Sequence, residues 1–255
     1  MASSMAFDDL PKDGKVLPAF ARVGWRWISR NPAAAIAPIL LPFIFLYFLR
    51  VISPSGLFPL EIVGAMLFTT QNLGSWVLGD SATWRIEMRL QDMFVASPLG
   101  KVRFLTGVAF SNFISAAPAL IVLAILLEYV TGGVSLFAWA VLAVSVVVLA
   151  TLFSAIGIAI SSRLKSQREI WPVGNLTFTV LGMLSPLYYP LSYLPPAWQT
   201  VARFLPATYA AQLAQGALGI TPASGSDMAI DAALLLVSAS IGTVLALRLY
   251  RWREN

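Results

Sequence analysis

The chain contains no cysteine and no histidine, and only 11% of its 255 residues are charged. Without cysteine it can form no disulfide, thiolate nucleophile or cysteine-based metal site, and without histidine it lacks the commonest general base and metal ligand. The string GxxxxGK[ST], whose backbone cradles nucleotide phosphates, is also absent. These absences exclude most catalytic schemes and an ATPase site of this kind, and we expect neither a bound metal nor a directly bound cofactor.

Apolar side chains are abundant instead: hydrophobic residues make up 58% of the chain, and the mean hydropathy is +0.78. A soluble domain of this length needs more polar surface, so the composition indicates an integral membrane protein. A helix needs roughly 20 apolar residues to cross a hydrocarbon core about 30 Å thick, and it satisfies its own backbone hydrogen bonds there. The sequence therefore predicts an all-α integral membrane protein with six spans, the fifth of them short: 33–52, 60–78, 104–129, 134–160, 172–188 and 229–250.

Lysine and arginine are distributed unevenly between the two sides that these spans define. Of the 17 such residues, all but Arg50 and Arg203 precede the first span, follow the second or fourth, or close the chain. Basic residues accumulate in cytoplasmic segments, so we predict a multi-pass protein of the cell membrane with both termini in the cytoplasm. The same bias explains the net charge of +5 without nucleic-acid binding.

Ionisable side chains are scarce inside the spans. An intramembrane aspartyl protease needs two carboxylates there, a serine enzyme needs a base such as lysine, and ion-coupled carriers usually keep ionisable relays at membrane depth. No lysine lies inside a span, and the acidic candidates fall at span ends: Glu61, Asp80, Glu128 and Asp231. We therefore predict that the chain is not an enzyme, and that it either conducts passively or draws its energy from a cytoplasmic partner.

Residues 1–31 are expected to form a cytoplasmic tail and an N-terminal interfacial amphipathic helix. Within VLPAFARVGWRWISRNP, arginine recurs every four residues on one helical face, at Arg22, Arg26 and Arg30. Another face carries Leu17, Phe20, Val23, Gly24, Trp27 and Ile28. Such a helix lies in the interface with its apolar face toward the acyl chains. A membrane anchor is the simplest interpretation, and a gating lever is compatible with it.

Residues 80–103, DSATWRIEMRLQDMFVASPLGKVR, lie on the cytoplasmic side between the second and third spans. Asp80 or Ser81 is a candidate helix N-cap, and Leu90, Met93 and Phe94 recur at helical spacing before a proline and a glycine end the segment. A short amphipathic helix in the cytoplasm has the shape of a docking surface. An ordinary solvated loop helix would show the same pattern.

The stretch SPLYYPLSYLPPAWQTVARFLPATY, residues 185–209, contains five prolines and four tyrosines. Pro196 is well placed to start a helix that reaches residue 204, and Pro206 to start another that reaches residue 216. Broken backbone at membrane depth must be buried in protein or face a watery cavity, so we predict a re-entrant extracellular segment over residues 186–219. Its aromatic side chains are candidates for interface anchors or for an extracellular gate: Tyr188, Tyr189, Tyr193, Trp198 and Tyr209.

These segments, in this order, resemble the permease subunits of type-2 ATP-binding-cassette (ABC) exporters, a class that includes drug-export and polysaccharide-export permeases. Residues 90–101, LQDMFVASPLGK, are similar to the family's coupling-helix region. Residues 185–219 are similar to its proline after the fifth span, Leu-Pro, tryptophan and later Leu-Pro-x-Thr-Tyr. Many relatives read near Gly-Thr-Leu-Glu at positions 89–92, and many carry a basic residue where this chain has Gln212 and Gln215. These departures bear on subfamily and substrate, and leave the architecture intact.

The resemblance implies a half-transporter. Two six-span subunits pair as a homodimer or a heterodimer, and a separate ATPase subunit, which hydrolyses ATP with Mg, binds each cytoplasmic face. The helix over residues 85–94 would move as a rigid unit when the ATPases close. The residues implied for ATPase coupling are Arg85, Glu87, Arg89, Leu90, Asp92, Met93 and Phe94.

The resemblance also implies that the first, second and fifth spans line the substrate path. Polar candidates on the second and fifth spans are Gln71, Asn72, Ser75, Asn175, Thr177 and Thr179. Hydrogen bonding between helices would explain the same residues equally well. Both interpretations stay open at the level of the sequence.

The predicted function is that of a permease, with residues 32–255 as one six-span domain. It would export an amphiphilic, lipid-linked or polymeric substrate when the partner ATPase opens the dimer interface. A non-transporting membrane scaffold that anchors a partner complex is the alternative. Membrane lipids are expected partners, and nucleic acid is not.

Overall fold

The computed structural model describes residues 16–97, 99–250 and 252. Regular structure in this part of the chain is helical, with ten α-helices and two short 3-10 helices. The α-helices are α1 (Val16–Arg30), α2 (Pro32–Ile52), α3 (Phe58–Ile86), α4 (Leu90–Ala96), α5 (Lys101–Thr131), α6 (Leu136–Ser161), α7 (Gln167–Leu184), α8 (Pro196–Ala202), α9 (Pro206–Ala217) and α10 (Gly225–Leu249). The 3-10 helices are η2 (Ser55–Leu57) and η3 (Leu191–Tyr193).

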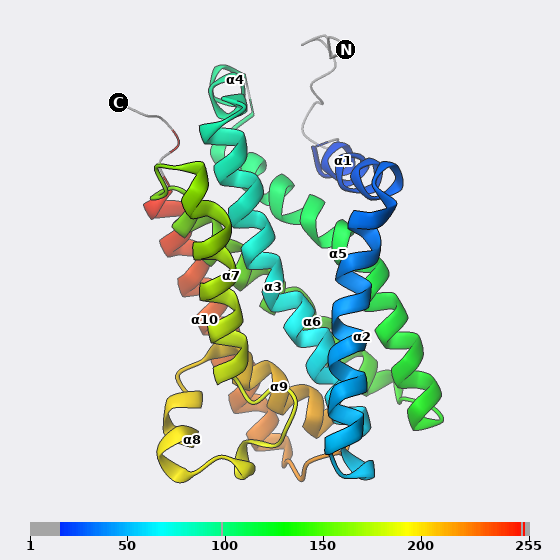
Figure 1. Ribbon diagram of the computed structural model, residues 1–255. Coiled ribbons are helices and arrows are strands. Elements are labelled where there is room, and N and C mark those ends of the chain that lie inside the picture. The colour runs from blue at the N-terminus through cyan, green and yellow to red at the C-terminus, as the bar shows by residue number, and fades with distance from the viewer. Residues whose placement is uncertain (1–15, 98, 251, 253–255) are drawn as a thin grey trace.

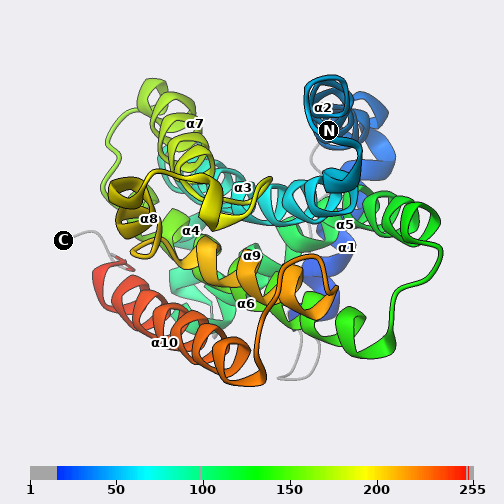
Figure 2. The same ribbon diagram turned by 90° about the horizontal axis from the view of Figure 1, so that it is seen from below.

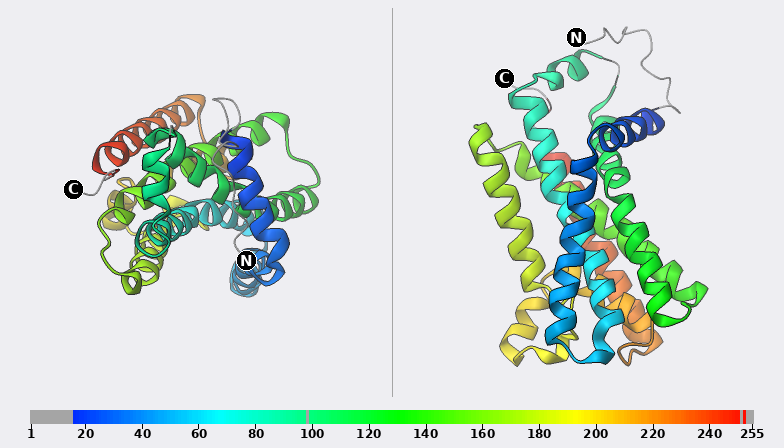
Figure 3. Two further views of the ribbon diagram at one scale, coloured as in Figure 1. Left: turned by 90° about the horizontal axis from the view of Figure 1, so that it is seen from above. Right: turned by 45° about the vertical axis from the view of Figure 1, so that its right-hand side comes forward.

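The six longest helices after α1 run alongside one another, and the shorter helices gather at the two ends of this bundle (Figure 1). Helices α1 and α4 lie at one end, which we call the α4 end. Helices α8 and α9 lie at the opposite end, which we call the α8 end (Figure 3, right). The bundle is therefore different at its two ends.

Helix α3 is the centre of the bundle, and most of its side chains between Leu60 and Ala82 are buried. It packs against α5, α6 and α7. A Cβ atom added to Gly157 of α6 would lie within 3 Å of the carbonyl oxygen of Gly74 in α3, so the two backbones approach to a distance that only glycine permits. Helices α2 and α7 flank α3 on the side away from α10 (Figure 2).

The predicted apolar runs coincide with the long helices. Among the residues whose side chains the structure describes, three helices are long and apolar enough to cross a membrane: α5, α6 and α10. Helices α2, α3 and α7 contain or overlap the other runs, 33–52, 60–78 and 172–188. Helix α7 begins at Gln167, where the Ser166 hydroxyl accepts a hydrogen bond from the Arg168 N–H, and it ends at Leu184. The predicted end of the fifth span at Tyr188 is therefore wrong, because the chain leaves the helix at Ser185.

The predicted helix cap at Asp80 or Ser81 is also wrong, because α3 continues to Ile86. Ser81 is buried, and the Asp80 Oδ2 atom accepts a hydrogen bond from the Asn112 Nδ2 atom of α5 at 2.9 Å. Packing against α5 thus extends α3 beyond its apolar run. The length of α3 was underestimated from its charge-poor stretch, because Asp80 and Asn112 satisfy each other's hydrogen bonds between the two helices.

At the α8 end, the two helices predicted from prolines are confirmed as α8 and α9. Pro196 and Pro206 each occupy the first helical position, where a missing N–H costs no hydrogen bond. Small side chains let α9 sit in the core of the bundle: Ala207, Ala210, Ala211 and Ala214 are fully buried. Helix α8 is largely exposed and is attached to α9, because the Thr208 hydroxyl donates to the Ala202 carbonyl oxygen at 2.6 Å.

Helix α1 is amphipathic as predicted, but its apolar face has two parts. Val16, Phe20, Gly24 and Ile28 recur every four residues and are buried. The rest of the predicted apolar face is exposed: Leu17, Val23 and Trp27. Helix α1 packs on α5 at two glycines, since a Cβ on Gly24 or on Gly107 would lie within 3 Å of Ser111 or Phe20, respectively.

Candidate functional site

The connection from α3 to α4 is a sharp turn. The Thr83 carbonyl oxygen accepts hydrogen bonds from the N–H groups of Glu87 and Met88, at 2.9 and 3.1 Å, and so closes the end of α3. Arg89 follows with φ 49°, in the left-handed region that side chains disfavour, and α4 starts at the next residue. A single rigid helix over residues 85–94 is therefore wrong, because α3 and α4 are separate helices.

Arg85 bonds to α6 instead of projecting with α4. Its Nη2 atom donates to the carbonyl oxygens of Ser161 and Leu164 at 2.8 and 2.5 Å. Carbonyl groups at a helix C-terminus lack intrahelical partners, and a cation there is stabilised by them. Arg85 therefore fastens the end of α3 to the end of α6.

Helix α4 presents one face to solvent. Glu87, Arg89, Asp92 and Met93 are exposed, whereas Leu90 and Phe94 are half-buried. The turn before α4 and the helix itself thus expose charges of both signs, at Glu87, Arg89 and Asp92, beside the flexible apolar side chain of Met93, at the tip of the bundle (Figure 1). Charged residues of this kind set the orientation and specificity of a protein contact.

The inner face of α4 contacts an aromatic cluster that the sequence did not reveal. The Phe94 ring lies 4.9 Å from that of Phe104 and 6.5 Å from that of Phe20. The Trp84 and Trp252 rings lie 6.2 and 5.4 Å from Phe104. The cluster joins α1, α3, α4, α5 and the segment after α10. Helical spacing had indicated Phe20 and Phe94, each within its own helix, but not that the two rings meet.

Two of the three polar candidates on α3 bond to α7. The Ser75 hydroxyl donates to the Asn175 Oδ1 atom at 3.2 Å, and the Gln71 Nε2 atom donates to the Phe178 carbonyl oxygen at 3.1 Å. Both Gln71 and Ser75 are buried. Asn72 donates to the Phe68 carbonyl oxygen of its own helix at 3.1 Å. The structure thus brings Ser75 and Asn175 together.

The other two predicted path residues, Thr177 and Thr179, are half-buried on α7. Asn175 is exposed on the same helix. Of the six candidates, these three on α7 and the half-buried Asn72 present surface, while Gln71 and Ser75 hold α3 against α7.

The five aromatic candidates at the α8 end differ in exposure. Tyr188 packs inward, with its ring 4.8 Å from Phe45 of α2 and 6.0 Å from Phe68 of α3. The Tyr209 hydroxyl donates to the Arg203 carbonyl oxygen, and Tyr189 is half-buried. Tyr193 and Trp198 are 63% and 53% exposed. Tyr188 therefore packs inside the bundle, whereas the rings of Tyr193 and Trp198 lie on the surface.

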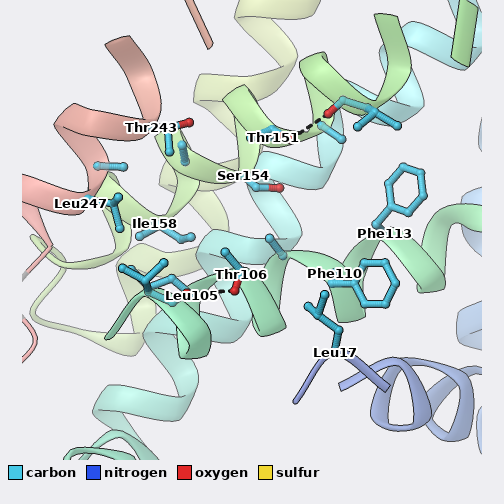
Figure 4. A pocket seen from close by; sticks show the side chains of 16 residues that line it. Leu17, Leu105, Thr106, Phe110, Phe113, Thr151, Ser154, Ile158, Thr243 and Leu247 are labelled. Carbon is cyan, nitrogen blue, oxygen red and sulfur yellow. Dashed lines mark hydrogen bonds between the residues drawn. The ribbon is translucent and has the colours of Figure 1, made fainter. Parts of the chain in front are cut away.

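An apolar crevice of about 360 Å³ lies between α5, α6 and α10, with Leu17 of α1 at its edge (Figure 4). Each of these three wall helices is long and apolar enough to cross a membrane. The hydroxyls of Thr106 and Thr151 donate to carbonyl oxygens of their own helices, so their hydrogen bonds are made within the helix (Figure 4). Its lining suits an acyl chain better than a hydrophilic molecule.

Within the described residues, no group of three or more acidic side chains is placed to hold a metal ion. Helices long and apolar enough to cross a membrane, in a bundle built around the buried helix α3, define a multi-pass membrane protein. The model of the ABC-2 type transporter family matches residues 19–218, and the chain belongs to that family. It is the transmembrane component of such a transporter, the permease part, which lacks the ATPase domain. A comparison with curated proteins gave no match.

Proposed function

We propose that this chain is one half of the membrane domain of an ATP-driven exporter. Six helices, α2, α3, α5, α6, α7 and α10, cross the cell membrane, with the α4 end in the cytoplasm and the α8 end outside. The exposed basic side chains of α1 support this orientation, because cytoplasmic segments carry the excess of lysine and arginine. Helices α8 and α9 then form the extracellular segment.

The observation that carries this proposal is the placement of α4. The turn before this helix and its outer face expose charges at Glu87, Arg89 and Asp92, while its inner face packs in the aromatic cluster through Phe94. A separate ATPase that docks on Glu87, Arg89, Asp92 and Met93 would therefore act on α1, α3 and α5 through that cluster. Hydrolysis of ATP with Mg takes place in the partner subunit.

The partner copy of the permease fits on the face formed by α2, α3 and α7. Helices α2 and α7 stand on either side of α3 (Figures 1 and 2). Both carry large exposed side chains, including Tyr47 and Phe48 on α2 and Leu176 and Val180 on α7. The substrate path would run between the two copies along this face, where Asn175, Thr177 and Thr179 supply polar surface. An amphiphilic, lipid-linked or polymeric substrate suits a path with so few charges.

Charge reversal on α4 tests the docking surface. We expect Glu87→Arg, Arg89→Glu and Asp92→Arg, combined, to lower co-purification of the ATPase at least tenfold, because the exposed charges would oppose their partners. Thermal stability should change little, since these side chains are exposed.

The matched control is Arg163→Glu, an exposed arginine in the loop between α6 and α7 at the same end of the bundle. It should leave co-purification unchanged. Full ATPase binding by the α4 variant would refute the assignment.

A further inference from the structure

The end of α10 is bonded directly to α4, although 159 residues separate the two partners in sequence. The Tyr250 hydroxyl donates to the Gln91 Oε1 atom at 2.9 Å, and the Gln91 Nε2 atom donates to the Trp252 carbonyl oxygen at 3.0 Å. Gln91 and Tyr250 are each only 3% exposed. The oxygen and the nitrogen of the Gln91 amide thus both form hydrogen bonds with the segment that follows α10.

Lys101, the first residue of α5, bonds to the same segment from its other side. Its ammonium group donates to the carbonyl oxygens of Leu247 and Tyr250, and it lies 5.7 Å from the centre of the Tyr250 ring. These carbonyl groups belong to the last turn of α10 and the residue after it, where no intrahelical donor is available and a cation is favoured. Lys101 therefore caps α10 and fixes it to α5.

These contacts hold α4 to α10 more firmly than exposed contacts could. A buried hydrogen bond that loses one partner leaves the other desolvated and unpaired, so a buried set tends to persist or to break as a whole. The Trp252 ring adds a contact with Phe104, which also touches Phe94 of α4. Helix α4 can move outward alone only by breaking this buried set.

At its other end α10 packs on α9. A Cβ on Gly216 of α9 would lie within 3 Å of the Ala223 Cβ atom just before α10, and the Met228 side chain is within 4 Å. Leu235 and Ala239 belong to the same buried cluster as Ala210 and Ala211 of α9. Helix α10 therefore connects α4 at one end of the bundle to α9 at the other.

We propose that Gln91, Lys101 and Tyr250 are positioning residues that transmit movement of α4 to α10, and through α10 to α9 at the α8 end. This inference rests on the proposed function, because the movement originates in an ATPase docked on α4. Its consequence is a second route from the docking surface to the extracellular segment, separate from the helices α2, α3 and α7 that face the partner copy.

The contact itself is tested on the full chain in lipid nanodiscs without an ATPase. Tyr250→Phe removes one hydroxyl and keeps the ring, and we expect amide hydrogen exchange in α4 to become about fivefold faster, as for loss of one buried hydrogen bond. Protection of the central part of α3 should not change. Tyr129→Phe is the matched control, since Tyr129 is 85% exposed. Unchanged exchange in α4 on Tyr250→Phe would overturn the inference.

Transmission is tested on the complex with its ATPase. The chain has no cysteine, so Phe204→Cys gives a single reporter at a side chain 82% exposed between α8 and α9. We expect ATP with vanadate to change the rate at which a membrane-impermeant maleimide labels this cysteine. In the Gln91→Leu or Tyr250→Phe variant, the labelling rate should return to the nucleotide-free value while ATP hydrolysis continues. Gln167→Leu, at an exposed glutamine in α7, is the control.

The outcomes separate the inference from the proposed function. If nucleotide still changes the labelling rate at residue 204 in the Gln91→Leu and Tyr250→Phe variants, transmission through these residues is refuted. It is also refuted if nucleotide does not change the labelling rate in the control complex. Failure of any ATPase to bind the unaltered chain would refute the proposed function instead. The exchange result on the chain alone would stand in that case.

Discussion

Gly24 shows at the scale of a single residue how α1 is attached to the bundle. Replacing a helix glycine by alanine normally stabilises by about 1 kcal/mol. Here the new Cβ would lie within 3 Å of the Ser111 carbonyl oxygen. We therefore expect Gly24→Ala to lower the free energy of unfolding by about 1–3 kcal/mol, the cost of overpacking, and thermal unfolding in detergent measures it. Gly56→Ala is the control, because a Cβ atom added there would have no other atom within 4 Å. Stabilisation by Gly24→Ala would contradict the packing of α1 on α5.

Single residues were also the hardest to assign from the sequence. Gln91 lay within a predicted amphipathic helix, but its partners are Tyr250 and Trp252, and nothing in local spacing indicates a contact over that separation. The family resemblance implied a coupling role for Arg85, and nothing in the sequence indicated that its guanidinium bonds to the end of α6. Periodicity reports which side of a helix is apolar, and it carries no information about which distant group a polar side chain meets.

At the scale of elements, the break between α3 and α4 separates two arginines with opposite roles. Arg85→Ala removes the hydrogen bonds of a cation to the Ser161 carbonyl at the end of α6 and to the Leu164 carbonyl in the loop that follows, so we expect a loss of about 2 kcal/mol in the free energy of unfolding. Arg89→Gly removes the steric cost of a side chain in the left-handed conformation, so we expect the free energy of unfolding to rise by about 1 kcal/mol. Thermal unfolding of the two variants side by side checks both signs. Destabilisation by Arg89→Gly would argue for a continuous helix.

Elements were predicted well where a local chemical rule applied. Prolines marked the starts of α8 and α9 correctly, because a proline at the first helical position costs no hydrogen bond. Helix α3 was underestimated, since its polar continuation is stabilised by Asn112 of another helix and not by its own hydropathy. The apolar face of α1 was found, but the two glycines that bring it onto α5 gave no periodic pattern.

At the scale of the whole molecule, the face of α2, α3 and α7 should meet a second copy. A chain without cysteine allows single-cysteine crosslinking, and we expect Tyr47→Cys or Val180→Cys to give a disulfide-linked dimer in native membranes. Both side chains are exposed, at 74% and 44%. Val237→Cys, on the exposed face of α10, should stay monomeric. Efficient crosslinking at residue 237 alone would place the partner on the opposite side.

The composition and the order of segments were sufficient to predict the class of the molecule, and membership of the ABC-2 type transporter family confirms it. Orientation across the membrane stays a prediction based on the positions of lysine and arginine. Substrate identity could not be predicted, because Gln71 and Ser75 of α3 are buried against α7, Asn72 bonds to its own helix, and the crevice between α5, α6 and α10 has an apolar lining.

ATP hydrolysis in lipid nanodiscs is the most direct test of the claim that this chain is a permease driven by a separate ATPase through α4. The chain alone should hydrolyse no ATP. Its complex with the co-purified ATPase should show a rate that a lipid, glycolipid or hydrophobic drug increases severalfold, and the triple charge reversal at residues 87, 89 and 92 should abolish that increase. A complex whose rate no amphiphile changes, or an increase that survives the charge reversal, would contradict the account.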